Sequence, residues 1–521
     1  MLRFLKKVLG ISRGAGSSEE GQRLTGDLDR DVRTLRGLLE NCADVVFRPL
    51  VLGPRREFRA MVITAEGLVD KDLIDDHVIR PLVVELAKED VWRRVKGAPP
   101  RELITMAIPF VDVKTEAVVS QVITQLFKGN GVLLVNGVDS AFIVGTPGQG
   151  LRSIDEPKVE TAIRGPHDGF IENLRQNVSL VRRRIRHPSL KVELISVGER
   201  SQQDVAVLYV DGVVDPKLVE EVRSRLKCIT IDAILDAGYI EQLIEDDWLS
   251  PFPQLLMTER PDKVTSAILE GRVAVLVDHS PGALIIPGTL DSFFHAPEDH
   301  YSRWFASSVI RSVRFIGTFL ALVTPGVYVA VTSFHPDLVS SSLILSVAAT
   351  RERVPFPAVV EAFFMLATLE LLREAGIRLP APIGQTIGIV GALVIGQAAV
   401  AAGIVSSIMV VIIAFTAISS FTMPSYEMGL AFRFFAPWVL ISAGILGLYG
   451  LVMAMLFILT HLSSLKSFGV SYLAPWAPRR TGALLRDTLV RSPLVYQSSR
   501  PGFLKPQDRR RMVDERRDSQ E

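Results

Sequence analysis

The C-terminal half of the chain contains one long stretch without charge. Residues Leu379–Tyr426, 48 in all, include no Asp, Glu, Lys or Arg. A helix needs ~20 apolar residues to cross the hydrocarbon core of a bilayer, so this stretch has about twice the required length. The pattern predicts a helical hairpin within a membrane.

The two arms of this predicted hairpin differ in composition. The first arm, residues 382–401, spaces Gly and Ala at helical intervals and carries three polar side chains. Small residues let helix backbones approach closely in lipid, and polar side chains there need a partner or water. The second arm, residues 404–423, is more apolar and β-branched, as is typical of a lipid-facing helix. We therefore expect the first arm to be the inner helix.

Two interpretations of the first arm stay open. The stripe of small residues is either a packing seam, or it lets several copies of the chain surround an axis with a narrow water path. Apolar side chains at a narrow point can hold such a path closed by dewetting. The pore or gate candidates in this arm are Gln385, Thr386, Gly388, Val390, Gly391, Val394, Gly396 and Gln397.

The first membrane span is predicted from the scarcity of charge. Only 11 of the 151 residues from 315 to 465 are charged, against 22 % of the whole chain. Phe315–Thr332 is uncharged, follows Arg311 and Arg314, and precedes a loop without Lys or Arg. By the positive-inside rule this helix runs from the cytoplasm outward.

Two further segments bear on the number of crossings. Leu338–Thr350 is apolar but short, so both a crossing and a re-entrant segment stay open. Phe434–Leu462 is long enough to span the membrane with tilt. The basic residues after it favour a cytoplasmic C-terminus and an even number of crossings. Residues 500–521 have the mixed-charge composition of a disordered tail.

Pro355–Gly376 is apolar but carries the acidic residues Glu361 and Glu370. Charge on a lipid-facing helix is costly, so these side chains should face protein, water or the membrane interface. One interpretation is an interfacial helix with its acids in water. The other places Glu361 or Glu370 at a cation path, where a ring of carboxylates favours cations.

The N-terminal part of the chain contains an internal repeat. Residues 44–74 and 189–219 align without a gap at an offset of 145. In both copies a strand is followed by an acidic residue, Asp70 or Asp215, at a position where a carboxylate can cap the first turn of a helix.

A second match follows in the same order. Residues 128–144 align with 270–286 at an offset of 142, and each copy reads as a strand, a tight turn and a second strand. Together the matches predict two α/β subdomains with the same strand order. The strands Ala60–Ala65 and Val205–Val210 should occupy the same place in their sheets.

A basic helix is predicted between the two copies, in residues 165–188. Its basic end is either a solvated helix face or a contact between subunits, since Arg is favoured in interface ion pairs. The interface candidates are Arg182, Arg183, Arg184 and Arg186.

Composition and motifs give no support for an enzyme. A net charge of +1 gives no reason to expect nucleic acid as a partner, and two cysteines support neither a disulfide framework nor a zinc site. No phosphate-binding loop, dinucleotide motif or hydrolase motif is present. His295–Tyr301 (HAPEDHY) resembles a metal-ligand cluster, but Pro297, Glu298 and Asp299 also suit a helix N-terminus. We expect no metal and no cofactor.

The predicted architecture is an α/β soluble part made of two similar subdomains, followed by an all-α multi-helix membrane domain. The basic N-terminus lacks the features of a signal peptide, so we expect the soluble part to be cytoplasmic. The predicted parts are an N-terminal helical segment (1–40), subdomain 1 (41–164), a connecting helix (165–188), subdomain 2 (189–300), a transmembrane domain (301–465), and a basic cytoplasmic C-terminal segment with a disordered tail (466–521).

Six segments carry the motifs of a known family. They are SPFPQLLMTERPDKV (Ser250–Val264), EGRVAVLVD (Glu270–Asp278), APED (Ala296–Asp299), VPFPAVVEAFF (Val354–Phe364), LLREAGIRLPAPIGQTIGIVGALVIGQAAV (Leu371–Val400) and SFGVSYLAPWAP (Ser467–Pro478). These segments resemble the A subunit of GerA-type spore germinant receptors, and the similarity extends from about residue 40 to residue 478. The long central motif is highly specific.

The resemblance implies a multi-pass subunit of a nutrient receptor in the inner membrane of a bacterial spore. In that family the A subunit works with a transporter-like B subunit, which binds the germinant, and with a lipoprotein C subunit. The resemblance also implies that the A subunit forms a homo-oligomer acting as a nutrient-gated cation channel. The alternatives are a scaffold that couples a nutrient-binding partner to a separate channel, and a sporulation-stage paralogue that amplifies ion release.

Overall fold

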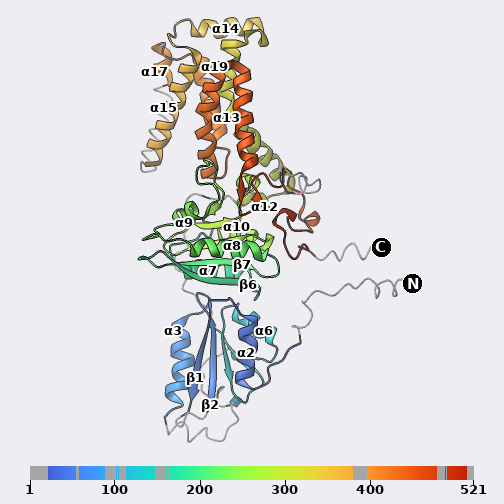
Figure 1. Ribbon diagram of the computed structural model, residues 1–521. Coiled ribbons are helices and arrows are strands. Elements are labelled where there is room, and N and C mark those ends of the chain that lie inside the picture. The colour runs from blue at the N-terminus through green and yellow to red at the C-terminus, as the bar shows by residue number, and fades with distance from the viewer. Residues whose placement is uncertain are drawn as a thin grey trace, which may run out of the picture.

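The computed structural model describes residues 21–53, 58–88, 101–102, 104, 113–146, 156–157, 160, 164–378, 396–477, 487–488 and 490–512. Figure 1 shows three parts in a row: subdomain 1, subdomain 2 and a helical bundle, with the C-terminal segment beside subdomain 2. The predicted α/β soluble part followed by an all-α part is confirmed.

Subdomain 1 is an antiparallel five-stranded sheet with helices on its faces. The strand order is β1-β2-β4-β5-β3. Its elements are α2 (Leu28–Leu38), β1 (Val45–Leu52), β2 (Phe58–Ala65), α3 (Lys71–Ile74) with the helical turns η1 (Asp75–Ile79) and η2 (Pro81–Glu85), β3 (Val113–Glu116), α6 (Val119–Leu126), β4 (Gly131–Val135) and β5 (Ala141–Val144).

Subdomain 2 repeats this arrangement with the order β6-β7-β9-β10-β8. Its elements are α7 (Leu174–Arg184), β6 (Leu190–Val197), β7 (Gln203–Val210), α8 (Pro216–Lys227), α9 (Ala237–Ile244), β8 (Leu256–Thr258), α10 (Pro261–Glu270), β9 (Val273–Val277), β10 (Ala283–Ile286), α11 (Leu290–Phe294) and α12 (Glu298–Tyr301). Strands β2 and β7 hold the same second position, so the predicted duplication is confirmed.

The helix caps expected in the two copies are present. The Asp70 side chain accepts hydrogen bonds from the backbone N–H groups of Asp72 and Leu73, and the Asp215 side chain accepts one from Lys217. A carboxylate at this place satisfies donors that have no partner within the helix. The same local signal therefore starts the same helix in each subdomain.

The helical bundle follows α12 and consists of helices of unequal length. They are α13 (Trp304–Phe334), η3 (Pro336–Leu338), α14 (Ser341–Arg351), α15 (Ala358–Arg378), α17 (Gly396–Ala401), α18 (Ser407–Ser420) and α19 (Tyr426–Ser464). Among the described residues, α13 and α19 pass the length and composition test for a helix that crosses a membrane, although α19 is interrupted by a turn at Gly447. Core side chains of both helices join the large apolar core that continues into subdomain 2.

Helix α14 lies across the end of the bundle that is farthest from the soluble part (Figure 1). It has 11 residues and none of them is buried. A helix of this length extends about 16 Å and cannot cross a hydrocarbon core of about 30 Å. In this arrangement the segment is not a crossing.

Helix α15 runs alongside the bundle and antiparallel to the first half of α19. Near its start Val359 packs against Gly444, and farther on Glu370 pairs with Arg433. Eleven residues therefore separate the contacts on both helices. Helix α15 is therefore aligned with the bundle axis, and its orientation relative to a membrane stays a prediction.

Helix α19 turns back on itself at Gly447, which has φ 64° and ψ −142°. The Phe252 ring of subdomain 2 contacts both Phe435 before the turn and His461 after it. The prediction of one tilted span over Phe434–Leu462 is therefore wrong. Residues 426–446 lead away from subdomain 2 and residues 448–464 return to it.

The predicted central hairpin is described in part. Residues 379–395, most of its first arm, lie outside the described residues. From the end of that arm the structure contains α17, and the second arm is α18, which has 14 residues. Helix α18 extends about 21 Å, which is shorter than a complete crossing.

The C-terminal segment returns to subdomain 2 and packs on it. Its elements are β11 (Lys466–Ser467), β12 (Val470–Ser471), η5 (Leu494–Tyr496) and η6 (Gly502–Leu504). Leu504 is buried, and the Gln507 backbone N–H donates to the Val213 carbonyl at 2.9 Å. The expected disorder from residue 500 onward is wrong for residues 500–512, because this apolar anchor was not recognised in the charged sequence around it.

Candidate functional site

A group of charged side chains lies where α15 meets α19 in the helical bundle. Glu370 Oε1 is 3.1 Å from Arg373 Nη1, and Glu370 Oε2 is 3.4 Å from Arg433 Nη1. Arg373 Nη2 also donates to Ser420 Oγ of α18 at 3.0 Å. These residues line a cavity of about 150 Å³ together with Thr318 and other residues of α13. This cavity lies at the end of the bundle next to subdomain 2, because Phe432, which also lines it, packs against Phe252 and Phe294.

The outer face of α15 carries a row of charges. Glu370, Glu374 and Arg378 follow one another at intervals of four residues, which places them on one side of the helix. Their side chains are 52 %, 59 % and 78 % exposed. The inward-facing Arg373 and Arg433 are largely buried. This side of α15 therefore needs water or another protein surface, not lipid.

Glu361 lies near the opposite end of α15 and is 1 % exposed. Its Oε1 accepts hydrogen bonds from the backbone N–H and the hydroxyl of Ser406, at 2.5 and 2.6 Å. Its Oε2 is 3.7 Å from Arg351 Nε. Because Ser406 is the N-cap of α18, Glu361 fastens α15 and the end of α14 to the start of α18.

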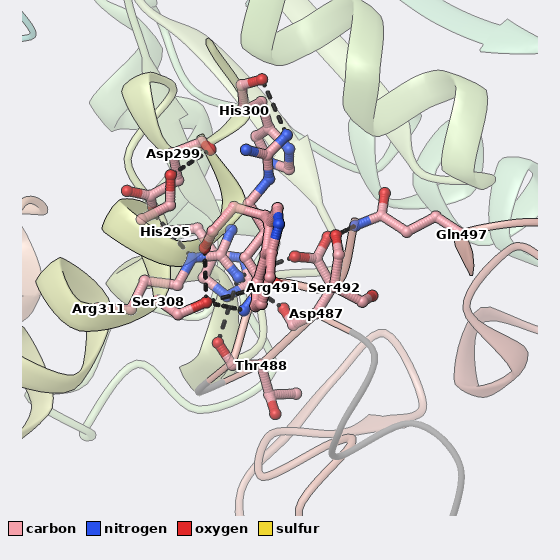
Figure 2. A network of polar contacts seen from close by, with 12 residues as sticks. His295, Asp299, His300, Ser308, Arg311, Asp487, Thr488, Arg491, Ser492 and Gln497 are labelled. Carbon is pink, nitrogen blue, oxygen red and sulfur yellow. Dashed lines mark hydrogen bonds and ion pairs between the residues drawn. The ribbon is translucent and has the colours of Figure 1, made fainter. Parts of the chain in front are cut away.

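A network of polar contacts lies at the foot of the bundle, where α13 meets subdomain 2 and the C-terminal segment (Figure 2). Arg311 is fully buried, and its Nε donates to Asp299 Oδ2 at 2.9 Å. Its Nη1 donates to Asp487 Oδ1 at 2.8 Å and to the Thr488 carbonyl at 3.2 Å. Arg314 Nη1 binds the same Asp299 carboxylate at 2.7 Å. Two cations of α13 thus share one carboxylate of α12.

Arg491 continues this network through the C-terminal segment. Its guanidinium donates to the carbonyls of Ser302 and His300, at 2.6 and 3.0 Å. Its backbone N–H donates to Ser308 Oγ at 3.1 Å. The C-terminal segment therefore holds both the α12–α13 junction and the first turns of α13.

A cavity of about 380 Å³ lies beside this network, between α10, α11 and the C-terminal segment. Burial raises the pKa of Asp291 to about 7, although Trp476 Nε1 donates to its carboxylate. Burial has the opposite effect on the basic side chain of His295 and lowers its pKa. The His295 Nε2 atom is 3.5 Å from Asp291 Oδ2. Both groups therefore favour their neutral forms at this place.

We expect the stability of the wild type relative to Asp291→Asn to fall as pH rises. A carboxyl whose pKa is raised to about 7 binds more protons in the folded state than in the unfolded state, between about pH 4 and about pH 7. Stability is then lost as pH rises through that window. His295 has the opposite sign, and the comparison with Asp291→Asn separates the two groups. Unfolding midpoints of the full chain in detergent at several pH values measure the difference; a difference that stays constant with pH would contradict it.

The geometry of these groups supports mechanical coupling more than chemistry. In the part of the chain that the structure describes, no group of three His, Cys, Asp or Glu residues is arranged to hold a metal ion. In the HAPEDHY motif, Asp299 is engaged by two arginines and Glu298 begins α12. This motif therefore positions α13.

Comparison with known proteins assigns the family. Residues 33–503 match the family described as Bacillus/Clostridium GerA spore germination protein. The chain belongs to this GerA family. It is 40 % identical over 494 residues to spore germination protein KA of Bacillus subtilis (strain 168). The alignment covers 95 % of this chain and 90 % of that protein. The predicted resemblance to GerA-type A subunits is thereby confirmed.

The chain is also similar to two further proteins. It is 40 % identical over 479 residues to the uncharacterized membrane protein YfkQ of Bacillus subtilis (strain 168), which covers 92 % of this chain and 91 % of that protein. The N-terminal domain of the A subunit of the Bacillus megaterium spore germinant receptor GerK3 is 31 % identical, with a TM-score of 0.41. That match covers 51 % of this chain and 96 % of the solved one.

The structure describes only some of the predicted pore or gate candidates. Gln385, Thr386, Gly388, Val390, Gly391 and Val394 lie outside the described residues. Gly396 and Gln397 begin α17, where Gly396 is near Val410 of α18. Of the two acidic candidates on α15, Glu361 is enclosed and Glu370 is open.

The four arginines proposed as interface candidates lie at the end of α7 in different environments. Arg182 is fully buried and pairs with Asp44 of subdomain 1, so its partner is within the chain. Arg184 pairs with Asp168. Arg183 is half-buried, whereas Arg186 is exposed and donates to the Arg183 carbonyl. A contact between subunits at Arg183 and Arg186 stays a prediction.

Sequence reasoning missed the polar network at the foot of the bundle, which we call the foot network. Its residues are Asp299, Arg311, Arg314, Asp487 and Arg491. Arg311 and Arg314 were recognised only as basic residues before a span, and Arg491 only as one of the basic residues of the C-terminal segment. Asp487 was not singled out. One signal was available: two arginines one turn apart at the start of an apolar helix need acidic partners once they are buried. The position of those partners, 176 residues away in the case of Asp487, is not readable from spacing.

Proposed function

We propose that this chain is the A-type subunit of a germinant receptor and that copies of it assemble into a cation channel. The channel would open when a nutrient binds a transporter-like partner subunit, with a lipoprotein subunit completing the receptor. The membrane would be the inner membrane of the spore, with both α/β subdomains in the cytoplasm. The family assignment supports the receptor role, and the helical bundle supports the channel.

One observation carries the channel proposal: the exposed row of charges on α15. Glu370 borders the cavity at the level of Thr318 and Leu322, within the apolar part of α13. A charged face on a helix of this apolar bundle is unfavourable against lipid, also near the end of the bundle next to subdomain 2. It is accommodated if several copies place this face around a water-filled axis, where carboxylates attract cations.

We expect Glu370→Gln to slow nutrient-triggered cation release from spores without abolishing receptor assembly. The substitution keeps the shape of the side chain and removes the charge that faces the proposed path. Glu370→Lys should slow release further, because it places positive charge next to Arg373 and Arg433. Release of monovalent cations after nutrient addition, normalised to the amount of receptor in the spore membrane, measures both effects.

Glu352→Gln is the matched control for Glu370→Gln, since Glu352 is exposed at the far end of the bundle. It should release cations at the wild-type rate. Unchanged release by Glu370→Gln and Glu370→Lys, with normal receptor amounts, would remove this face of α15 from the proposed path.

The foot network favours a second candidate function, a scaffold that passes a signal to a separate channel. It joins subdomain 2, α13 and the C-terminal segment through Arg311 and Arg491. The two functions differ in a measurable way. Substitutions of Glu370 should change ion selectivity in a channel, but only the rate of release in a scaffold. Sodium-to-potassium permeability of vesicles containing the complete receptor distinguishes them.

A further inference from the structure

The first turns of α13 have inverted polarity. Their outward side chains are apolar and 47–67 % exposed: Trp304, Phe305, Val309, Ile310, Val313 and Ile316. A helix on a water-facing surface normally shows the opposite pattern, with its apolar stripe toward the core.

The inward side of the same turns is polar. Ser307 is fully buried, with its hydroxyl donating to the Asp299 carbonyl at 2.8 Å. Ser308 and Arg311 are buried one turn apart and bind the C-terminal segment. The protein therefore satisfies the polar groups of this helix internally and presents its apolar groups to the surroundings.

We propose that residues 304–316, which we call the foot of α13, lie against the lipid at the cytoplasmic boundary of the bilayer. The membrane contact of α13 then begins at Trp304, about 16 Å along the helix before the uncharged stretch that starts at Phe315. The foot runs obliquely from the bundle toward α12 (Figure 1), as an interfacial segment would.

Three features favour lipid as the occupant of this face. The exposed face of the foot carries no charge from Trp304 to Ile316, and it continues into Phe319, which is 54 % exposed on the apolar span. A Trp stands at its beginning, where aromatic side chains prefer the headgroup level. The exposed Arg303 just before it can extend its charged end toward headgroups and water.

This placement explains why Arg311 and Arg314 of the foot network are paired with carboxylates. Arg311 and Arg314 would lie at the depth of the headgroups, shielded from lipid by the apolar side of their own helix. Buried charge there needs full pairing, and Asp299 and Asp487 supply the carboxylates. A movement of subdomain 2 would then be transmitted to a helix held in the membrane surface.

Spin labels at single cysteines test the proposal in the full chain. Cys42→Ser and Cys228→Ser remove the native thiols, and labels are then placed at Val309, Val313 and two reference positions. Phe457, exposed on the returning half of α19, is the lipid reference, and Val51, exposed in subdomain 1, is the water reference. In vesicles of phosphatidylglycerol and phosphatidylethanolamine, we expect labels at 309 and 313 to relax faster with oxygen than with a water-soluble nickel chelate, as at 457.

The opposite ratio at 309 and 313, matching position 51, would place the foot in water and overturn the proposal. Labels that neither reagent reaches would show a protein partner, for example a second copy, and would also overturn it. Elution of each labelled variant at the wild-type volume in detergent confirms that it is folded. The measurement needs no ion conduction, so it stands or fails independently of the channel proposal.

Discussion

Replacing Asp299 by alanine is expected to lower the free energy of unfolding by about 3–5 kcal/mol, the usual cost of removing one partner from a buried ion pair. The Asp299 side chain is 2 % exposed, and it accepts hydrogen bonds from Arg311, which is fully buried, and from Arg314. Among the described residues, Arg311 would then keep Asp487 and two backbone carbonyls of the C-terminal segment as partners. Two positive charges would then face each other across the gap.

Denaturant unfolding of the full chain in mild detergent measures this loss. Asp337→Ala is the matched control, because Asp337 is exposed at the far end of the bundle and should change stability by less than about 0.5 kcal/mol. Asp487→Ala should fall between the two, since the Asp487 side chain is partly exposed and, within the described part of the chain, pairs with Arg311 alone. Equal midpoints for Asp299→Ala and Asp337→Ala would show that the network does not stabilise the fold.

The soluble part could be predicted from the sequence because its signals are local and occur twice. Asp70 and Asp215 cap equivalent helices, and the strands β2 and β7 hold equivalent places. A duplication lets one copy support the interpretation of the other. The predictions that depended on two aligned patterns were confirmed.

The path of the helical bundle could not be predicted because it depends on a single backbone angle. Gly447 takes a positive φ, and a Cβ atom there would lie 2.9 Å from the Cβ of Phe334. Glycine is common in membrane helices, so its presence does not indicate a turn. The hydrophobic pattern alone therefore favoured one long span.

The roles of the two acidic residues on α15 also could not be separated by sequence. Glu361 and Glu370 are the same residue type on the same helix. Glu361 is buried and binds Ser406, whereas Glu370 faces outward. That distinction depends on α18, whose N-cap follows Glu361 by 45 residues. Contacts across such separations are formed by the bundle and have no local signal.

Arg182→Ala is expected to have an effect comparable to Asp299→Ala, at the joint between the two subdomains. Arg182 Nε and Nη2 bind the two oxygens of Asp44 at 2.7 and 2.8 Å, and both side chains are almost completely buried. The guanidinium also lies 4.5 Å from the centre of the Phe127 ring. Its removal leaves the Asp44 carboxylate buried and unpaired, so we expect a loss of about 3–5 kcal/mol.

Arg186→Ala, one turn farther on and exposed, is the control for Arg182→Ala. The double substitution Arg182→Met with Asp44→Leu should recover much of the stability, because apolar side chains of similar size can replace a buried ion pair. Hydrogen exchange of the full chain in detergent locates the effect: exchange should rise in both subdomains next to the joint, and less in the helical bundle. If the single and double substitutions lose the same stability, the unpaired charge is not the cause, and the packing of Arg182 against Phe127 must account for the loss.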